Sequence, residues 1–273
     1  MAILGAAFLA ARLRGTVRES QAARNGGGDR TRAALAAAGI ALAVAAFVWG
    51  FGVAPLPDYP SLAAHPDPSI PGRVAFLRWW AGPPCLYVVP AAGGEARRLR
   101  CTDDEADDPD WLGEPIGWTE EGLIVVHVFG PSGPRAVVLD HDTGRTVERI
   151  RIQEPLVART LPSDRSVRAD GARLLVRSSG RTATLGIAPP DGWPVEVTRV
   201  SGPPGFAFRE ALWAPDGEWI LVRDSNQNLL VLPARENVRP RLLAERVSGP
   251  FAWHIPGTAA GTIDLDSLGA TLR

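Results

Sequence analysis

The stretch that decides the fold is residues 212–222, which read Leu-Trp-Ala-Pro-Asp-Gly-Glu-Trp-Ile-Leu-Val. In it, a tight turn that ends in Asp216-Gly217 is followed directly by an apolar strand. Turns that end in glycine precede apolar runs at four other places: Gly72, Gly122, Asp170-Gly171 and, with a weaker strand, Gly257. The spacing of these five glycines is close to the period of a four-stranded propeller blade.

Two other features keep the same phase. A large apolar residue stands four positions before each of the last four glycines: Trp118, Val167, Trp213 and Trp253. Each apolar strand is also followed by a second one and then by a turn, as in residues 229–237. We therefore predict an all-β, propeller-like array of about four to five four-stranded blades over residues 73–273. An irregular β-sandwich is the alternative fold.

Residues 212–222 closely resemble the WSPDG-x-x-I-x-F repeat of TolB-like, WD-repeat-like propellers, and residues 86–99 resemble the other half of that repeat. The resemblance spans roughly Pro71 to Gly257 and implies the fold, whereas a TolB-like role in the envelope is an analogy. The units at Gly122 and Gly171 depart from the motif. We expect the motif residues to be structural: Trp118, Gly122, Asp170, Gly171, Trp213, Asp216, Gly217 and Trp253.

An apolar run without a charged residue occupies residues 33–54, long enough as a helix for the roughly 30 Å core of a bilayer. Six arginines precede this run, and no basic residue follows it until Arg73. We therefore expect one transmembrane helix that contacts lipid, with residues 1–32 as a cytoplasmic tail and the C-terminal domain outside. A cleaved signal peptide is the alternative. The composition, rich in Ala, Gly and Pro and without lysine, is typical of a GC-rich bacterial genome.

Residues 55–72 contain six prolines, so we expect an extended spacer between the membrane and the domain. Cys85 and Cys101 lie equidistant from Gly93, and an antiparallel hairpin centred there would hold their Cα atoms roughly 4.5–5.5 Å apart. We expect a structural disulfide between them, with two free thiols as the alternative.

Recognisable chemistry is sparse in this sequence. The acidic loop at residues 103–110 is rich in carboxylates but does not match a calcium-loop spacing, so we expect no metal and no cofactor. We find no nucleophile elbow or zinc-ligand spacing, and a net charge of −1 argues against nucleic-acid binding. We therefore expect a non-catalytic binding or scaffold module in the bacterial envelope, with an envelope protein as its partner. A propeller hydrolase or lyase and a ligand sensor are the alternatives.

Overall fold

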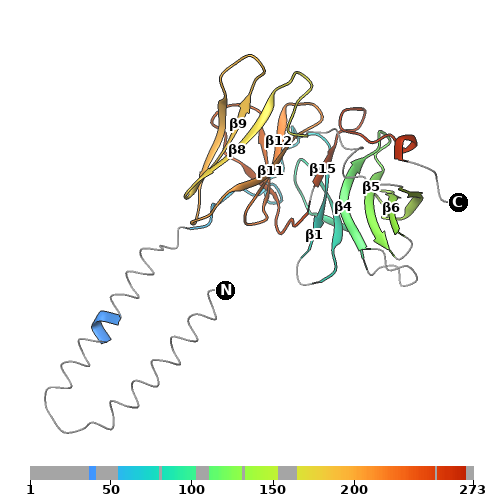
Figure 1. Cartoon of the computed structure of the whole chain (residues 1–273), viewed down its shortest axis with the longest axis horizontal. Coiled ribbons are helices and arrows are strands. Elements are labelled where there is room, and N and C mark those ends of the chain that lie inside the picture. Colours follow the sequence, from blue (N-terminus) through green and yellow to red (C-terminus); the bar gives the residue numbers. More distant parts are fainter. Residues whose placement is uncertain are drawn as a thin grey trace, which may run out of the picture. The chain divides into compact units, whose positions relative to one another are not determined.

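The computed structural model describes residues 37–40, 55–79, 82–102, 111–130, 133–152, 165–249 and 251–268. Over these residues the chain is all-β apart from residues 37–40 and one short 3-10 helix, η2 (Leu265–Leu268). The strands form four antiparallel sheets, which we number I to IV (Figure 1). Residues 54–273 make up one compact unit.

Each sheet is built from strands that are neighbours along the chain, with one exception in sheet I. Sheet I contains β15 (Phe251–His254), β1 (Arg73–Arg78), β2 (Cys85–Pro90) and β3 (Arg97–Cys101). Sheet II contains β4 (Trp111–Trp118), β5 (Ile124–Gly130), β6 (Gly133–Leu139) and β7 (Thr146–Arg151). Sheet III contains β8 (Arg173–Ser179), β9 (Thr182–Ala188) and β10 (Val195–Ser201). Sheet IV contains β11 (Phe208–Trp213), β12 (Trp219–Asp224), β13 (Leu229–Pro233) and β14 (Arg241–Ala244).

Sheet I joins the two ends of the domain. Its strand β15, near the C-terminus, pairs antiparallel with β1, which follows Gly72, as Figure 1 shows. The register places Phe76 opposite Phe251 and Val74 opposite Trp253. The strand before Gly257 and the strands after Gly72 are therefore two parts of one sheet. For this reason five glycine turns mark four sheets, an arrangement consistent with a propeller-like fold.

The recurring glycines are explained by the backbone conformation of the turns. Gly122, Gly171 and Gly217 all have positive φ, in the left-handed region that other residues rarely adopt. In each turn the glycine N–H donates to the carbonyl three residues earlier, at 2.8–3.1 Å. Gly72 shares this conformation, and a Cβ there would overlap the carbonyl oxygen of His254. Gly72 is thus needed where the two ends of the domain meet.

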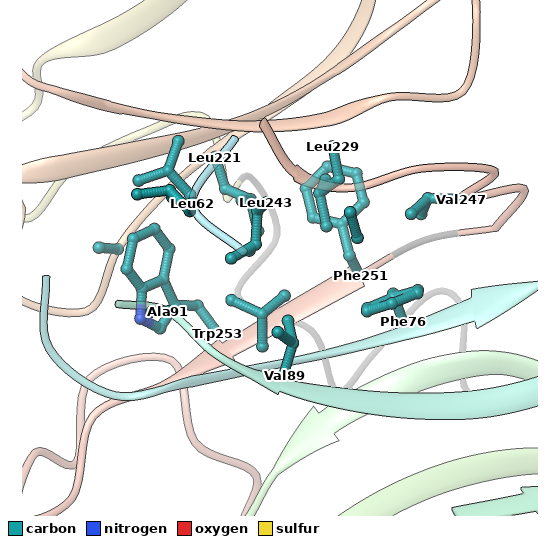
Figure 2. Packing of buried hydrophobic residues seen from close by; sticks show 14 of the residues in the cluster. Leu62, Phe76, Val89, Ala91, Leu221, Leu229, Leu243, Val247, Phe251 and Trp253 are labelled. Atoms are coloured by element: carbon teal, nitrogen blue, oxygen red, sulfur yellow. The ribbon is translucent and has the colours of Figure 1, made fainter. Parts of the chain in front are cut away.

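The sheets pack face to face through separate hydrophobic clusters. Sheets IV and I share a cluster that includes Leu221, Leu229, Phe76 and Phe251, all fully buried (Figure 2). A second cluster joins sheets III and IV, and a third joins sheets I and II. The opposite side of sheet II is covered by the C-terminal segment 258–268, since a fourth cluster contains the following residues: Val125, Ala136, Val138, Ile150, Ile152, Ile263 and Leu268.

Residues 55–72, which we expected to be a spacer, are attached to the domain from Tyr59 onward. Leu62 and Ile70 are buried, and the hydroxyl of Tyr59 donates to Asp224 Oδ2 at 3.3 Å. The N–H of Leu62 donates to the carbonyl of Leu242 in β14 at 2.8 Å. The prolines do prevent a regular strand, but they leave the apolar side chains between them free to enter the core.

The expected transmembrane helix falls almost entirely outside the described residues. Of residues 33–54 the structure describes only residues 37–40, which are helical. Among all the residues that it describes, no helix is long and apolar enough to cross a membrane. The expected tail at 1–32 and the acidic loop at 103–110 also lie outside the described part of the chain.

We predict that Phe251→Ala destabilises the domain by about 3–5 kcal/mol, because removal of a fully buried ring in β15 would leave a cavity. Denaturant unfolding followed by tryptophan fluorescence measures this loss. Val147→Ala, at an exposed position of β7, is the control and should leave the free energy of unfolding nearly unchanged. Equal effects of the two substitutions would contradict the packing of β15 against the sheets.

Candidate binding site

An edge strand of each of three sheets lies next to Arg165. Its Nη1 donates to the carbonyl of Phe251 in β15 at 3.1 Å, and its own carbonyl accepts the N–H of Trp213 in β11 at 3.1 Å. A Cβ on Gly117 in β4 would lie 3.2 Å from its Nη2. Burial lowers the pKa of the Arg165 guanidinium, and the charge of Glu210 opposes that shift. Arg165 remains a cation because an arginine side chain does not lose its proton in proteins.

A pocket of about 340 Å³ opens beside Arg165. Its walls come from the glycine turns of sheets III and IV, from β15 and from residues 260–261 of the C-terminal segment. Trp213 and Trp253 supply apolar surface, whereas Arg165, Arg168 and Asp216 supply charge. Its volume is at the lower end of the range for ligand sites, and its mixture of apolar surface and few polar groups is typical of them.

The tryptophans of the repeat connect parts of the chain that are distant in sequence. The indole N–H of Trp118 donates to the carbonyl of Ala252 at 3.1 Å, from sheet II to sheet I. The indole of Trp213 donates to the carbonyl of Ser166 at 3.0 Å. The indole of Trp253 donates to the carbonyl of Pro71 at 2.9 Å, from one end of the domain to the other. These three tryptophans therefore tie the sheets together, as well as filling the space between them.

Arg168, a residue that sequence reasoning missed, contacts four residues of the repeated motif: Asp170, Gly171, Trp213 and Gly217. Its guanidinium donates to both carboxylate oxygens of Asp170, at 3.0 and 2.6 Å, and to the carbonyl of Gly217 at 3.1 Å. It also lies over the ring of Trp213, 4.7 Å from its centroid. The hydrogen bonds from Arg168 lower the pKa of Asp170 to about 2. Arg168 thus joins the turns of sheets III and IV.

Asp216 serves its own turn, because its Oδ1 accepts the backbone N–H of Glu218 at 2.9 Å. Gly122 and Trp118 lie apart from the pocket, next to the side chain of His254. The His254 ring stacks on Trp118 with ring centroids 5.1 Å apart. Burial lowers the pKa of His254 and, in sheet II, that of His127. Among the residues that the structure describes, no group of three or more His, Cys, Asp or Glu side chains is arranged to hold a metal.

Cys85 and Cys101 form a disulfide at the end of the β2–β3 hairpin, where they are opposite each other in register. Their Cα atoms are 4.0 Å apart, slightly closer than we expected from an ideal antiparallel pair. The bridge lies in sheet I and does not line the pocket beside Arg165.

The sequence contained a signal for Arg168 but not for Arg165. Arg168 directly follows Val167, the position in phase with the repeat tryptophans, so it stands inside a recognisable turn. Arg165 lies outside the repeated motif, and only the folded chain brings it against β15 and β11.

Comparisons with known proteins identify no family. No protein-family model matches the sequence, and no curated protein sequence matches it. Among solved structures, the chain is similar to TolB from Acinetobacter baumannii, with 14% identity over 70% of this chain and a TM-score of 0.24. The matched part covers 54% of the TolB chain, so this chain spans about half the length of that protein.

We predict that Trp213→Phe lowers the free energy of unfolding by about 0.5–1.5 kcal/mol, since it removes the indole donor to the carbonyl of Ser166, which keeps its bond from the N–H of Leu174. Denaturant titration measures the change. Trp193→Phe is the matched control, because Trp193 is 91% exposed and its substitution should leave the stability nearly unchanged. A Trp213→Phe protein as stable as the control would refute a bridging role for the indole.

We also predict that acid weakens the fold through His127 and His254. An unfolded histidine titrates near pH 6.5, whereas burial lowers the pKa of both in the folded chain, so the unfolded state binds more protons below that pH. The contribution of both histidines to stability should be present above about pH 6.5 and decrease as the pH falls below it. Unfolding titrations at a series of pH values measure this decrease. The double variant His127→Gln/His254→Gln should flatten this decrease, and the control His65→Gln, at an exposed position, should leave it unchanged. An unchanged slope in the double variant would show that these two histidines do not cause the decrease.

Proposed function

We propose that this chain is a membrane-anchored, extracytoplasmic β-propeller that acts as a non-catalytic binding or scaffold module in the bacterial envelope. The observation that carries the proposal is that the polar groups at and beside the pocket already hold hydrogen bonds within the domain. Asp170 is held by Arg168, Asp216 by its own turn, and the indoles of Trp213 and Trp253 by backbone carbonyls. Polar groups that are hydrogen-bonded within the domain can shape a surface, but they are poorly placed to transfer protons or attack a substrate.

The pocket also favours a certain kind of partner. Trp213 and Trp253 are only 8% and 5% exposed, so the apolar surface that they give the pocket is narrow. The cationic Arg165 beside them would attract a carboxylate. We therefore propose that the partner is an envelope protein that presents an acidic residue next to an apolar one. The site uses positions where several turns converge, as is common for binding surfaces on rigid scaffolds.

The proposed location rests on the sequence and the disulfide. The arginine-rich segment before residues 33–54 and the lack of basic residues after it favour a cytoplasmic N-terminus. The Cys85–Cys101 bridge supports the same orientation, because disulfides persist mainly outside the reducing cytoplasm. The resemblance of residues 212–222 to the TolB-like repeat supports the propeller.

We predict that a photo-crosslinking amino acid at Ala260, an exposed residue at the pocket, captures a specific envelope protein in living cells. The adduct is detected on gels and its partner identified by mass spectrometry. The same probe at Val147, exposed on β7 and not lining the pocket, is the positional control.

A discrete adduct from position 260 that is absent from position 147 is the expected result. The proposal fails if neither position yields a protein adduct, and a low-molecular-weight adduct at position 260 would instead point to a small ligand or to the enzyme alternative.

A further inference from the structure

A groove lined by arginines runs along the outer strands of sheets III and IV. One part, of about 630 Å³, lies between β12 and the loop after β13, with Arg235, Arg239 and Arg241 in its lining. A second part, of about 500 Å³, lies between that loop and β10, with Arg199 in its lining. The two parts lie on either side of residues 237–239, which line both of them. We call the two parts together the arginine groove.

The four arginines are only partly neutralised. Arg241 contacts Asp67 at 2.6 Å and Arg199 contacts Glu196 at 2.6 Å. Arg239 lies 3.9 Å from a carboxylate oxygen of Asp58, an exposed and weak contact. Arg235 has no ion-pair partner among the residues that the structure describes.

The lining therefore carries one more guanidinium group than carboxylates, and the exposed Glu236, next to Arg235 in the chain, lies outside the lining. Arginine binds phosphate groups well because its planar donors match their oxygens.

Two exposed apolar residues lie close in sequence to residues that line the groove. Trp193 is 91% exposed and stands in the β9–β10 turn, three residues before Glu196 of the groove lining. Leu56 is 65% exposed and directly precedes Pro57, which also lines the groove. A tryptophan with both an apolar ring and an N–H is favoured at a membrane interface.

The chain enters the folded domain at this groove. Pro57 and Asp58 line it, and from Tyr59 onward the chain is packed against sheet IV. Residues 59–72 are thus not available as a spacer. If residues 33–54 cross the bilayer, only a few residues separate the lipid from the groove, and the groove is delivered to the membrane surface by the covalent chain itself.

We propose that the arginine groove, with Trp193 and Leu56, docks on the surface of an anionic phospholipid bilayer. The proposal rests on the membrane anchoring of the proposed function and adds a second contact to it. The arginines pair with lipid phosphates, and the Trp193 ring inserts among the headgroups. Juxtamembrane basic residues strengthen such contacts by about 1 kcal/mol each, or about fivefold.

The test places an environment-sensitive fluorophore on Asp191→Cys, next to Trp193, in the full chain reconstituted into nanodiscs that contain doxyl-labelled lipid. Val147→Cys, at an exposed position of β7 in sheet II and outside the groove lining, is the positional control. The discs contain either phosphatidylcholine alone or phosphatidylcholine with phosphatidylglycerol. Labelling is done without reductant, since the native cysteines form a disulfide.

We expect strong quenching at position 191 in anionic discs, weaker quenching in neutral discs, and little at position 147. Arg235→Gln/Arg239→Gln should lower the ratio of docked to undocked chains by about fivefold per arginine. Arg98→Gln/Arg145→Gln removes the same charge from exposed positions in sheet I and in the turn of sheet II, and should change nothing.

Equal quenching at positions 191 and 147, or quenching that depends on neither the lipid charge nor the groove variant, would overturn the docking proposal. Extraction with alkaline carbonate distinguishes a failure of docking from a failure of membrane anchoring. A chain that stays in the membrane without quenching at position 191 loses the docking proposal alone. A chain that carbonate extracts loses the anchoring, and the docking proposal with it.

Discussion

The pairing of β15 with β1 is the contact on which the rest of the domain depends. It joins the first and the last strand of the domain, so the chain must close a very long loop before the contact forms. The side chains of β15 stabilise more than one interface between sheets. Phe251 and Trp253 enter the cluster between sheets IV and I, and Ala252 enters the cluster between sheets I and II. One short strand thus holds two sheet interfaces together.

The same strand builds the candidate site. The carbonyl of Phe251 accepts a hydrogen bond from Arg165, and the carbonyl of Ala252 accepts one from Trp118. Trp253 and Ala252 form one wall of the pocket. Binding and stability are therefore coupled in this domain: a ligand that needs the pocket also needs β15 in place, and would stabilise the closed arrangement by mass action.

The repeated elements could be predicted from the sequence, because each has a local physical cause: a positive φ at Gly217 or Gly171 favours glycine. The closure was harder to foresee, since the repeat invites a search for a strand after Gly257, whereas the strand that pairs comes before it. Long-range packing also left no local signal. The prolines of residues 55–72 correctly indicated irregular backbone, yet Leu62 is buried against distant strands. Arg165 belongs to no motif and acquires its place only when β11 and β15 converge.

The most direct test of this architecture is a cysteine crosslink between the two ends of the domain. Ala75 and Ala252 are buried register partners in β1 and β15, and paired positions in antiparallel strands lie close enough for a disulfide. In the Ala75→Cys/Ala252→Cys protein, peptide mass spectrometry after proteolysis should find these two positions covalently linked, together with the native Cys85–Cys101 bridge. Free thiols at positions 75 and 252 in the folded, oxidised protein would contradict the closure of the chain into a single sheet.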